Sequence, residues 1–265
     1  MKSHLVLNNK KVFYTDKGHG AVIVLLHGYL ESLEIWSDFS TELSKKYRVI
    51  SFDIPGHGDS EIVSKNHSMK NLAEIIYKSL NVLKINKCLL IGHSMGGYLT
   101  LMMHKLFPEL LLGFCLFHSH PFADTEETKK KRLREIELVK DGRKDLIAKF
   151  NIPNAFATDN IKKFNNEAKR AIEIALQTSE NGIIANLNTM MNRPDFSESL
   201  SNSSIPFLYI LGKKDNYIDY KLIGGKVVLP QLSELCVLEK SGHMGFIEEK
   251  EKSLSCIMQF INRII

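Results

Sequence analysis

The sequence Ile91-Gly92-His93-Ser94-Met95-Gly96-Gly97 determines how the rest of the chain is interpreted. It follows an apolar run at 88–91 that predicts a buried strand, and it precedes a helical pattern that stops before Pro108. Gly-x-Ser-x-Gly between a strand and a helix is typical of a nucleophile elbow, a sharp turn that lifts a serine hydroxyl above the sheet. Glycines flank the serine because side chains there would collide with the neighbouring strand and helix. The stretch therefore predicts that Ser94 is a nucleophile.

The bulk composition indicates an ordinary globular protein. The chain has 265 residues, of which 44% are hydrophobic, and its net charge is +5. The most basic run, 129–134, is bracketed by glutamates. This pattern is typical of a solvated helix face, so no nucleic-acid partner is expected. No run approaches the roughly 18 apolar residues of a membrane span, and residues 1–11 lack a signal-peptide stretch. We expect a cytoplasmic protein with no membrane span.

The cysteines and histidines do not show metal-ligand spacing. Of the four cysteines, three lie in apolar strand-like runs, so we expect buried free thiols rather than disulfides. These cysteines are Cys88, Cys115, Cys236 and Cys256. A metal site would need clustered ligands, which the histidine spacing does not supply. The sequence predicts neither a metal nor a cofactor.

Strand and helix patterns alternate through most of the chain. We expect strands at 4–7, 11–15, 21–26, 48–53, 88–91, 113–117, 206–212 and 235–238, and a final helix at about 249–264. Between 118 and 200 only helical stripes occur, enough for three or four helices. The fold class predicted is α/β: a doubly wound, mostly parallel sheet with an inserted helical lid. The expected parts are a core at 1–117 and 201–265 and a lid at 118–200, above the carboxyl ends of the strands.

A serine nucleophile needs a base, and the base needs a carboxylate that holds its tautomer. Asp215 follows the predicted strand that ends at Gly212, and His243 follows the one that ends at Leu238. The order Ser94, Asp215, His243 is the chain order of a Ser-Asp-His triad in which each member follows a strand. Asp124, after the strand that ends at Phe117, is the alternative acid.

The remaining site residues are predicted from their neighbours. Two backbone N–H groups are needed for an oxyanion hole, and we expect them from Met95, after the nucleophile, and Tyr29, after His27-Gly28. At the entrance to the lid, His118 is expected either to touch substrate or to form a hinge. Met190, in a lid stripe, is a candidate for lining a substrate pocket, although such stripes more often pack in the core. His27 and His93 are expected to brace turns by hydrogen bonding.

These motifs together resemble the α/β-hydrolase fold family, in its capped serine esterase type. The resemblance covers nearly the whole chain and includes carboxylesterases and pimeloyl-carrier methyl ester esterase-like hydrolases. The residues that carry it are His27-Gly28-Tyr29, Asp53 to Ser60, Gly92 to Gly97, Gly212 to Asp215, and Ser241-Gly242-His243. Serine in place of an aspartate nucleophile argues against the dehalogenases and epoxide hydrolases of this fold.

The expected function is a serine hydrolase of small to medium carboxylic esters, acting through an acyl-enzyme. One alternative uses the same triad in a C–C hydrolase, a cofactor-free haloperoxidase or a lyase. Another is a non-enzymatic sensor that closes its lid on a small molecule. The resemblance also implies an acyl carrier protein as a possible partner, for which Lys130 and Arg134 would supply basic charge. Acyl chain length, alcohol and oligomeric state are not predicted.

Overall fold

The centre of the protein is a twisted sheet of eight strands. The computed structural model describes residues 2–64 and 67–265. Within them the strand order is β1-β2-β4-β3-β5-β6-β7-β8. The strands are β1 (Lys2–Leu7), β2 (Lys10–Lys17), β3 (Val22–Leu26), β4 (Arg48–Phe52), β5 (Cys88–His93), β6 (Leu111–Phe117), β7 (Phe207–Gly212) and β8 (Ser233–Leu238). β2 pairs antiparallel with β1 and with β4. The remaining neighbours, in the order β4-β3-β5-β6-β7-β8, all pair parallel. The mostly parallel sheet is confirmed.

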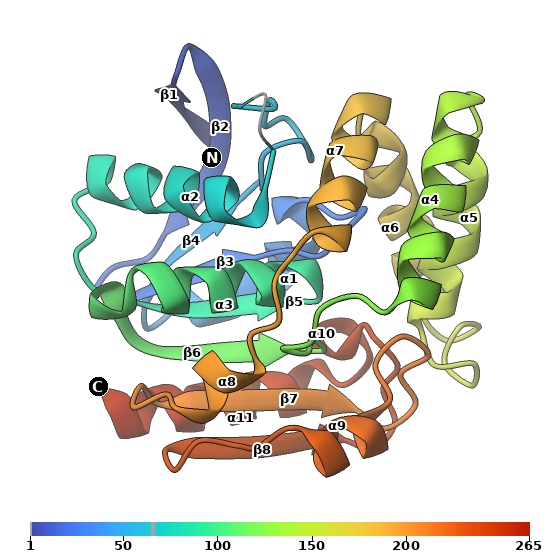
Figure 1. Ribbon diagram of the computed structural model, residues 1–265. Coiled ribbons are helices and arrows are strands. Elements are labelled where there is room, and N and C mark those ends of the chain that lie inside the picture. The colour runs from blue at the N-terminus through green and yellow to red at the C-terminus, as the bar shows by residue number, and fades with distance from the viewer. Residues whose placement is uncertain (1, 65–66) are drawn as a thin grey trace.

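Helices cover both faces of this sheet. α2 and α3 pack together on one face, and α1 and α11 lie on the other (Figure 1). The helices are η1 (Leu33–Trp36), α1 (Ser37–Leu43), α2 (Met69–Val82), α3 (Met95–Leu106), η2 (Pro108–Leu110), α4 (Glu126–Lys140), α5 (Lys144–Ala155), α6 (Asn165–Gln177), α7 (Glu180–Met191), α8 (Ser197–Ser201), α9 (Tyr220–Lys226), α10 (Gly245–Glu248) and α11 (Lys250–Ile264). No helix within the described ranges is both long and apolar enough to cross a bilayer.

The apolar runs become strands because helices bury them from both sides. Every residue of β5 and β7 is buried, which explains why these strands lack the alternation of a sheet with one wet face. Behind the sheet, Trp36 and Phe39 are almost completely buried, as expected for core residues. The Trp36 ring lies 4.6 Å from the ring of Phe246, centroid to centroid, so the core reaches the segment after β8. The core therefore extends to the residues that carry the site.

The segment between β6 and β7 is helical throughout its regular structure. Helices α4 to α7 stand at the end of the sheet to which the arrowheads of β6 and β7 point (Figure 1). α4 packs against α7, and α5 packs against α6. The amide of Phe196 donates to the carbonyl oxygen of Pro121 at 2.8 Å, so the chain entering this segment is bonded to the chain leaving it. The short α8 brings the number of helices in this stretch above the three or four expected.

The cysteines correct one expectation. Cys236 in β8 and Cys256 in α11 form a disulfide, with their Cα atoms 6.6 Å apart, whereas free thiols were expected. The expectation failed because α11 packs back onto the edge of the sheet, a contact that strand-like patterns do not show. Cys88 and Cys115 are buried free thiols, as expected.

Candidate active site

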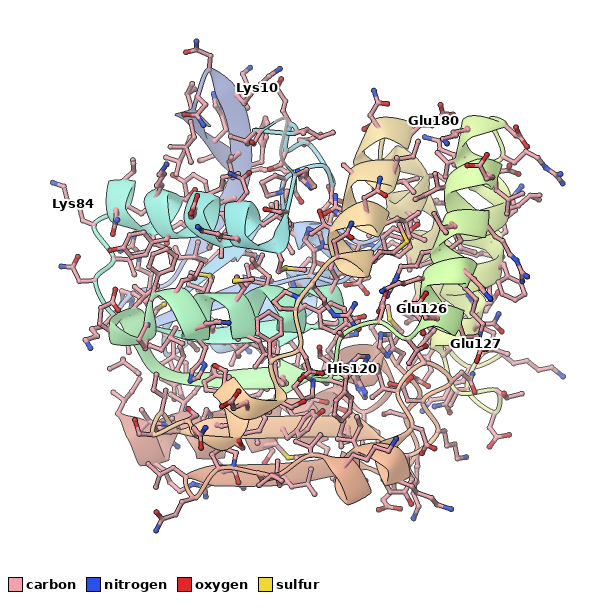
Figure 2. The ribbon with its side chains drawn as sticks, in the orientation of Figure 1. Lys10, Lys84, His120, Glu126, Glu127 and Glu180 are labelled. Carbon is pink, nitrogen blue, oxygen red and sulfur yellow. A yellow bond between two sulfur atoms is a disulfide. The ribbon has the colours of Figure 1, made fainter. Side chains whose placement is uncertain are left out.

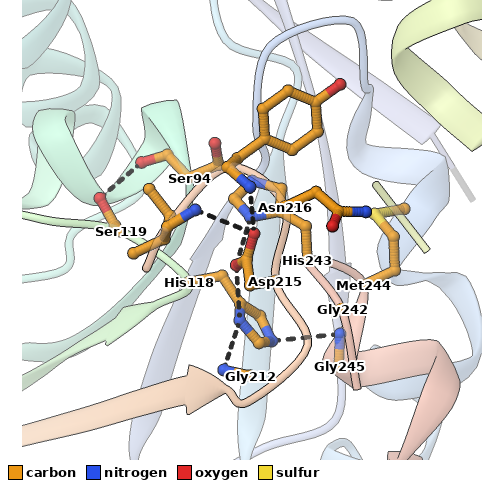
Figure 3. A network of polar contacts seen from close by, with 12 residues as sticks. Ser94, His118, Ser119, Gly212, Asp215, Asn216, Gly242, His243, Met244 and Gly245 are labelled. Carbon is orange, nitrogen blue, oxygen red and sulfur yellow. Dashed lines mark hydrogen bonds and ion pairs between the residues drawn. The ribbon is translucent and has the colours of Figure 1, made fainter. Parts of the chain in front are cut away.

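Ser94 lies at the turn between β5 and α3. Its φ of 49° and ψ of −113° fall outside the regions that L residues usually occupy, which costs about 1–3 kcal/mol. Two hydrogen bonds hold this conformation, one at the amide of Ser94 and one at its carbonyl oxygen. Ser94 N donates to the carbonyl oxygen of Phe117 at 3.0 Å, and Ser119 Oγ donates to the carbonyl oxygen of Ser94 at 2.8 Å (Figure 3). The turn therefore has the strained backbone that a nucleophile elbow requires.

The two flanking glycines allow this turn to pack tightly. A Cβ atom on Gly92 would lie 2.3 Å from the carbonyl oxygen of Gly96. A Cβ atom on Gly96 would lie 2.3 Å from the carbonyl oxygen of Leu26 in β3. Both obstacles are backbone atoms, which cannot move aside as a flexible side chain can. Glycine at these positions is thus what lets α3 begin directly against β3 and β5.

Asp215 and His243 meet at the same edge of the sheet. His243 Nδ1 lies 2.8 Å from Asp215 Oδ2, while Asp215 Oδ1 accepts from the amides of Tyr217 at 2.8 Å and Ile218 at 3.0 Å (Figure 3). Because Nδ1 donates to the carboxylate, Nε2 is left with a free lone pair. Burial lowers the pKa of His243, but the charge of Asp215 outweighs it and leaves the pKa raised. The geometry leaves His243 Nε2 free to act as a base.

The carboxyl group of Asp215 is held ionised. Burial raises its pKa, but the positive charge on His243 and the hydrogen bonds from both neighbouring histidines bring the pKa well below its usual range. The alternative acid, Asp124, bonds elsewhere: its oxygens accept from Arg132 and Arg193. The structure thus pairs His243 with Asp215.

The place of His118 corrects the expectation of a substrate contact. Its side chain is completely buried and does not line the cavity that opens above Ser94. Nδ1 lies 3.3 Å from Asp215 Oδ2, and Nε2 accepts from the amide of Gly245 at 3.2 Å. The amide of Gly212 also lies close to Nδ1, where it would need an acceptor. Neither tautomer of His118 can satisfy all of these neighbours, and the nearby carboxylate of Asp215 favours the tautomer with its proton on Nδ1. A φ of 48° turns this residue underneath the acid instead of into the lid.

A second buried pair lies behind the elbow. Glu31 Oε2 accepts from the amide of Gly28 at 2.5 Å and lies 3.0 Å from His93 Nδ1. His93 Nε2 lies 2.8 Å from the carbonyl oxygen of His243. Both ring nitrogens of His93 therefore face acceptors, Glu31 Oε2 and the carbonyl oxygen of His243. Burial raises the pKa of Glu31, but His93 outweighs it and lowers the pKa. His93 braces the turn as expected; the sequence analysis missed its partner.

Two amide groups remain unpaired beside Ser94. The amide of Gly28 is bonded to Glu31, and that of Leu30 donates to His57 Nε2 at 3.4 Å. The amides of Tyr29 and Met95 have no acceptor within residues 2–64 and 67–265. These are the two donors that the sequence predicts for an oxyanion hole, at a helix N-terminus and at the end of β3.

Comparison with known protein families agrees with this fold. A family model described as alpha/beta hydrolase fold matches residues 21–151. The chain has the α/β-hydrolase fold. It is 23% identical to 2-succinyl-6-hydroxy-2,4-cyclohexadiene-1-carboxylate synthase of Enterobacter sp. strain 638, covering 90% of this chain and 91% of that protein. It is 27% identical to 3-oxoadipate enol-lactonase 1 of Acinetobacter baylyi, covering 87% and 84%.

A solved structure shows the same α/β-hydrolase fold. A thermophilic esterase from Thermogutta terrifontis, solved with malate bound, superimposes with a TM-score of 0.93 at 23% identity. The match covers 100% of this chain and 99% of the esterase. At that identity the likeness concerns the fold, so the reactivity of this α/β-hydrolase has to be argued from its own residues.

The α/β-hydrolase encloses a cavity of about 470 Å³ above Ser94. Ser94, His243 and Tyr29 line it, and so does Met190 of α7, whose contact with a substrate stays a prediction. The sequence analysis did not predict the contribution of Tyr217 and Ile218, which follow the acid, or of α9. Their signal is weak, because a short helix that contains Gly224 and Gly225 resembles a loop in sequence. The cavity has the size of a small-molecule site.

One group of side chains in the described part of the chain has metal-ligand proximity. The ligand atoms of His118, Asp215 and His243 lie within 4.8 Å of one another. An ion bound there would replace the hydrogen bond from His243 to Asp215, which already accounts for their approach. Hydrogen bonds among these three side chains therefore explain why they lie together.

Proposed function

We propose that this α/β-hydrolase is a serine esterase that cleaves carboxylic esters through an acyl-enzyme. The observation that carries the proposal is the hydrogen bond of 2.8 Å from His243 to Asp215, in a cavity whose floor also holds Ser94 on a strained turn. A serine hydroxyl needs such a base, and the carboxylate both orients the imidazole and stabilises its charged form. The similarity to a lactonase, whose substrate contains an ester bond, supports this reaction class.

In the proposed mechanism, Ser94 Oγ attacks the ester carbonyl while His243 Nε2 accepts its proton. The amides of Tyr29 and Met95 bind the oxyanion that forms, each lowering the barrier by about 3–4 kcal/mol. His243 then donates its proton to the leaving alcohol. In the second half, water attacks the acyl-enzyme with His243 as base, and the acid product leaves.

Nitrophenyl esters from acetate to decanoate test the proposal. Wild-type protein should hydrolyse some of them, Ser94→Ala should be inactive, and the exposed control Ser255→Ala should retain full activity. The preferred chain length would measure the room under α4 and α7. Full turnover by Ser94→Ala would refute the assignment, as would a Ser94 that neither turns over any ester nor reacts with a fluorophosphonate probe.

The similarity to the Enterobacter synthase supports a second candidate, in which the same three residues act as a base without forming an acyl-enzyme. Rapid-quench mass spectrometry with a slow ester distinguishes the two. An adduct on Ser94 supports the esterase. Proton exchange or elimination without an adduct supports the base chemistry.

A carrier-linked substrate receives little support from the charges on α4. Glu126 and Glu127 lie at the outer start of this helix (Figure 2). They pair with Lys129 and Lys131, each at 2.8 Å, which leaves Lys130 and Arg134 as the exposed charges that a carrier protein could contact. Two charges on one helix are a small surface for a protein partner, so we treat a small-molecule ester as the substrate.

A further inference from the structure

A cluster of charges on the lid side of the cavity has no role in the proposed mechanism. It contains two guanidinium groups and one carboxylate. Asp124 Oδ2 accepts from Arg132 Nε at 2.6 Å, and Asp124 Oδ1 accepts from Arg193 Nη1 at 2.5 Å. Arg193 is sealed from solvent, and its other bonds go to the carbonyl oxygens of Met190 at 2.7 Å and Phe122 at 2.9 Å. Arg193 therefore neutralises Asp124 without reaching the cavity.

Two arginines share one carboxylate, so the cluster keeps a net positive charge, and of the two arginines Arg132 lines the cavity. Its Nε and Nη2 donate to Asp124, whereas Nη1 has no acceptor among the residues that the structure describes. The side chain is 16% exposed and lines the cavity. Burial lowers the pKa of Arg132, but Asp124 outweighs this and leaves the pKa raised, so the group stays charged. Two N–H donors with a positive charge thus lie on the cavity wall.

Tyr98 supplies a third donor on the same wall. It lies one helical turn after Ser94 and lines the cavity. His120 lies between the sheet and the lid (Figure 2). Its Nδ1 accepts a hydrogen bond of 3.2 Å from the amide of Phe122. Burial lowers the pKa of His120 to about 3, so the neutral ring carries its proton on Nε2, 3.3 Å from Tyr98 Oη. Because Oη accepts that proton, the hydroxyl hydrogen of Tyr98 is free to point at a ligand.

Besides Asp124, a second carboxylate lines the cavity near Arg132, and it makes its hydrogen bonds with other residues. Glu135 accepts from the hydroxyl of Tyr29 at 3.1 Å and from Asn151 Nδ2 at 3.1 Å. No ion pair joins it to Arg132 in the part of the chain described. The ring of Tyr98 is in turn fixed by the guanidinium of Arg193, 3.8 Å above its centroid. The rings and guanidinium groups are therefore held in place, and the free donors of Tyr98 and Arg132 have no acceptor in the part of the chain described.

We propose that the substrate carries a carboxylate besides its ester, and that Tyr98 Oη and Arg132 Nη1 bind this carboxylate while Ser94 attacks the ester. The inference rests on the proposed esterase function and adds the substrate class, the monoesters of dicarboxylic acids. A guanidinium and a phenol are suited to a carboxylate, because charge-assisted hydrogen bonds are about twice as strong as neutral ones. A neutral acyl chain would leave both donors unpaired when it displaces water from the cavity.

The test compares monomethyl succinate, glutarate and adipate with the methyl esters whose far carboxyl is a primary amide. The wild type should prefer one of the carboxylates by roughly 10- to 100-fold in kcat/KM, the range expected for one charge-assisted hydrogen bond. Arg132→Gln and Tyr98→Phe should lose the preference through KM. Lys130→Gln, which removes an exposed charge from the same helix, should retain it. Equal use of acids and amides would overturn the inference.

A binding measurement separates this inference from the proposed function and from misfolding. Calorimetry with glutarate and with glutaramide needs no turnover, and circular dichroism reports the fold of each variant. Glutarate should bind the wild type at least 10-fold more tightly than glutaramide, and Tyr98→Phe should weaken glutarate binding even if Arg132→Gln unfolds. Equal affinities for glutarate and glutaramide would refute the carboxylate site even if Ser94 hydrolyses neutral esters. Selective binding of glutarate without hydrolysis of any ester would support the site and refute the esterase.

Discussion

Replacing Asp215 by asparagine tests the part of the site on which the proposed mechanism depends most. The carboxylate accepts hydrogen bonds from four directions: His243 and His118 at Oδ2, and the amides of Tyr217 and Ile218 at Oδ1. Asparagine keeps the shape of the side chain and can still accept from the two amides through its oxygen. Its NH₂ group then faces His243 Nδ1 and forces the proton to Nε2, where the base needs its lone pair.

Two changes in the kinetics are expected from Asp215→Asn: a lower kcat and a shifted pH profile. The plateau of kcat should fall by about 10⁴-fold, the loss measured for this exchange in a serine protease, which corresponds to about 5 kcal/mol of barrier. The acidic limb of the pH profile should move to lower pH. Asp215 raises the pKa of His243, so the wild type loses activity as the pH falls through this raised pKa, and removing the charge lowers the pKa.

The assay is kcat/KM for the preferred nitrophenyl ester between pH 5 and 9, for the wild type and Asp215→Asn. Asp159→Asn serves as the control, since it removes a carboxylate that lies outside the cavity and pairs with Lys214. Its profile should match the wild type. A variant Asp215→Asn that retains a tenth of the wild-type kcat, or whose acidic limb stays in place, would refute the assigned roles of Asp215 and His243.

Three further predictions concern stability. Glu31→Gln should lower the free energy of unfolding by about 1.5–3 kcal/mol in urea titrations, because it replaces the buried carboxylate that accepts hydrogen bonds from the amide of Gly28 and from His93; an unchanged midpoint would mean that these bonds do not stabilise the fold. Burial lowers the pKa of His118 to about 4, so the unfolded chain binds the extra proton between pH 6.5 and 4. Stability should therefore fall by about 3 kcal/mol across that window and less steeply in His118→Gln, whereas parallel curves would contradict the assignment. Cleaving the disulfide of Cys236 and Cys256, 20 residues apart, should cost about 3 kcal/mol, seen as a lower Tm with dithiothreitol that Cys256→Ser reproduces; equal melting curves would count against it.

The parts of the site that the sequence predicted are those encoded by short local patterns. A strand followed at once by Gly-x-Ser-x-Gly placed Ser94 on its turn, and strand ends located Asp215 and His243, because parallel strands present their carboxyl ends at one edge. Met190 was placed in the lid by the helical spacing of its neighbours. In each case the information lies within about ten residues of the position concerned.

Other features depend on contacts between distant residues. His118 follows a strand as Asp215 does, and only its positive φ and its distance from Oδ2 show that it lies beneath the acid. Glu31 stands in a loop whose polarity suggests exposure, yet it is bonded to residues 3 and 62 positions away. Tyr98 and Arg132 belong to separate helical stripes, and their relation becomes visible only once α4 packs beside the sheet.

The sheet order described above also has a consequence for synthesis of the chain. During synthesis, β5 and the turn at Ser94 emerge before β7 and β8. β5 can pair with β3 and β6 as soon as residue 117 has emerged. Asp215 and His243 follow β7 and β8 and emerge only after residues 118–206; β7 then pairs with β6, and β8 pairs with β7. A nascent chain can therefore form the turn at Ser94 before the proposed acid and base have been synthesised. Synthesis adds about 5–20 residues per second, so an interval of several seconds separates the proposed nucleophile Ser94 from the proposed base His243.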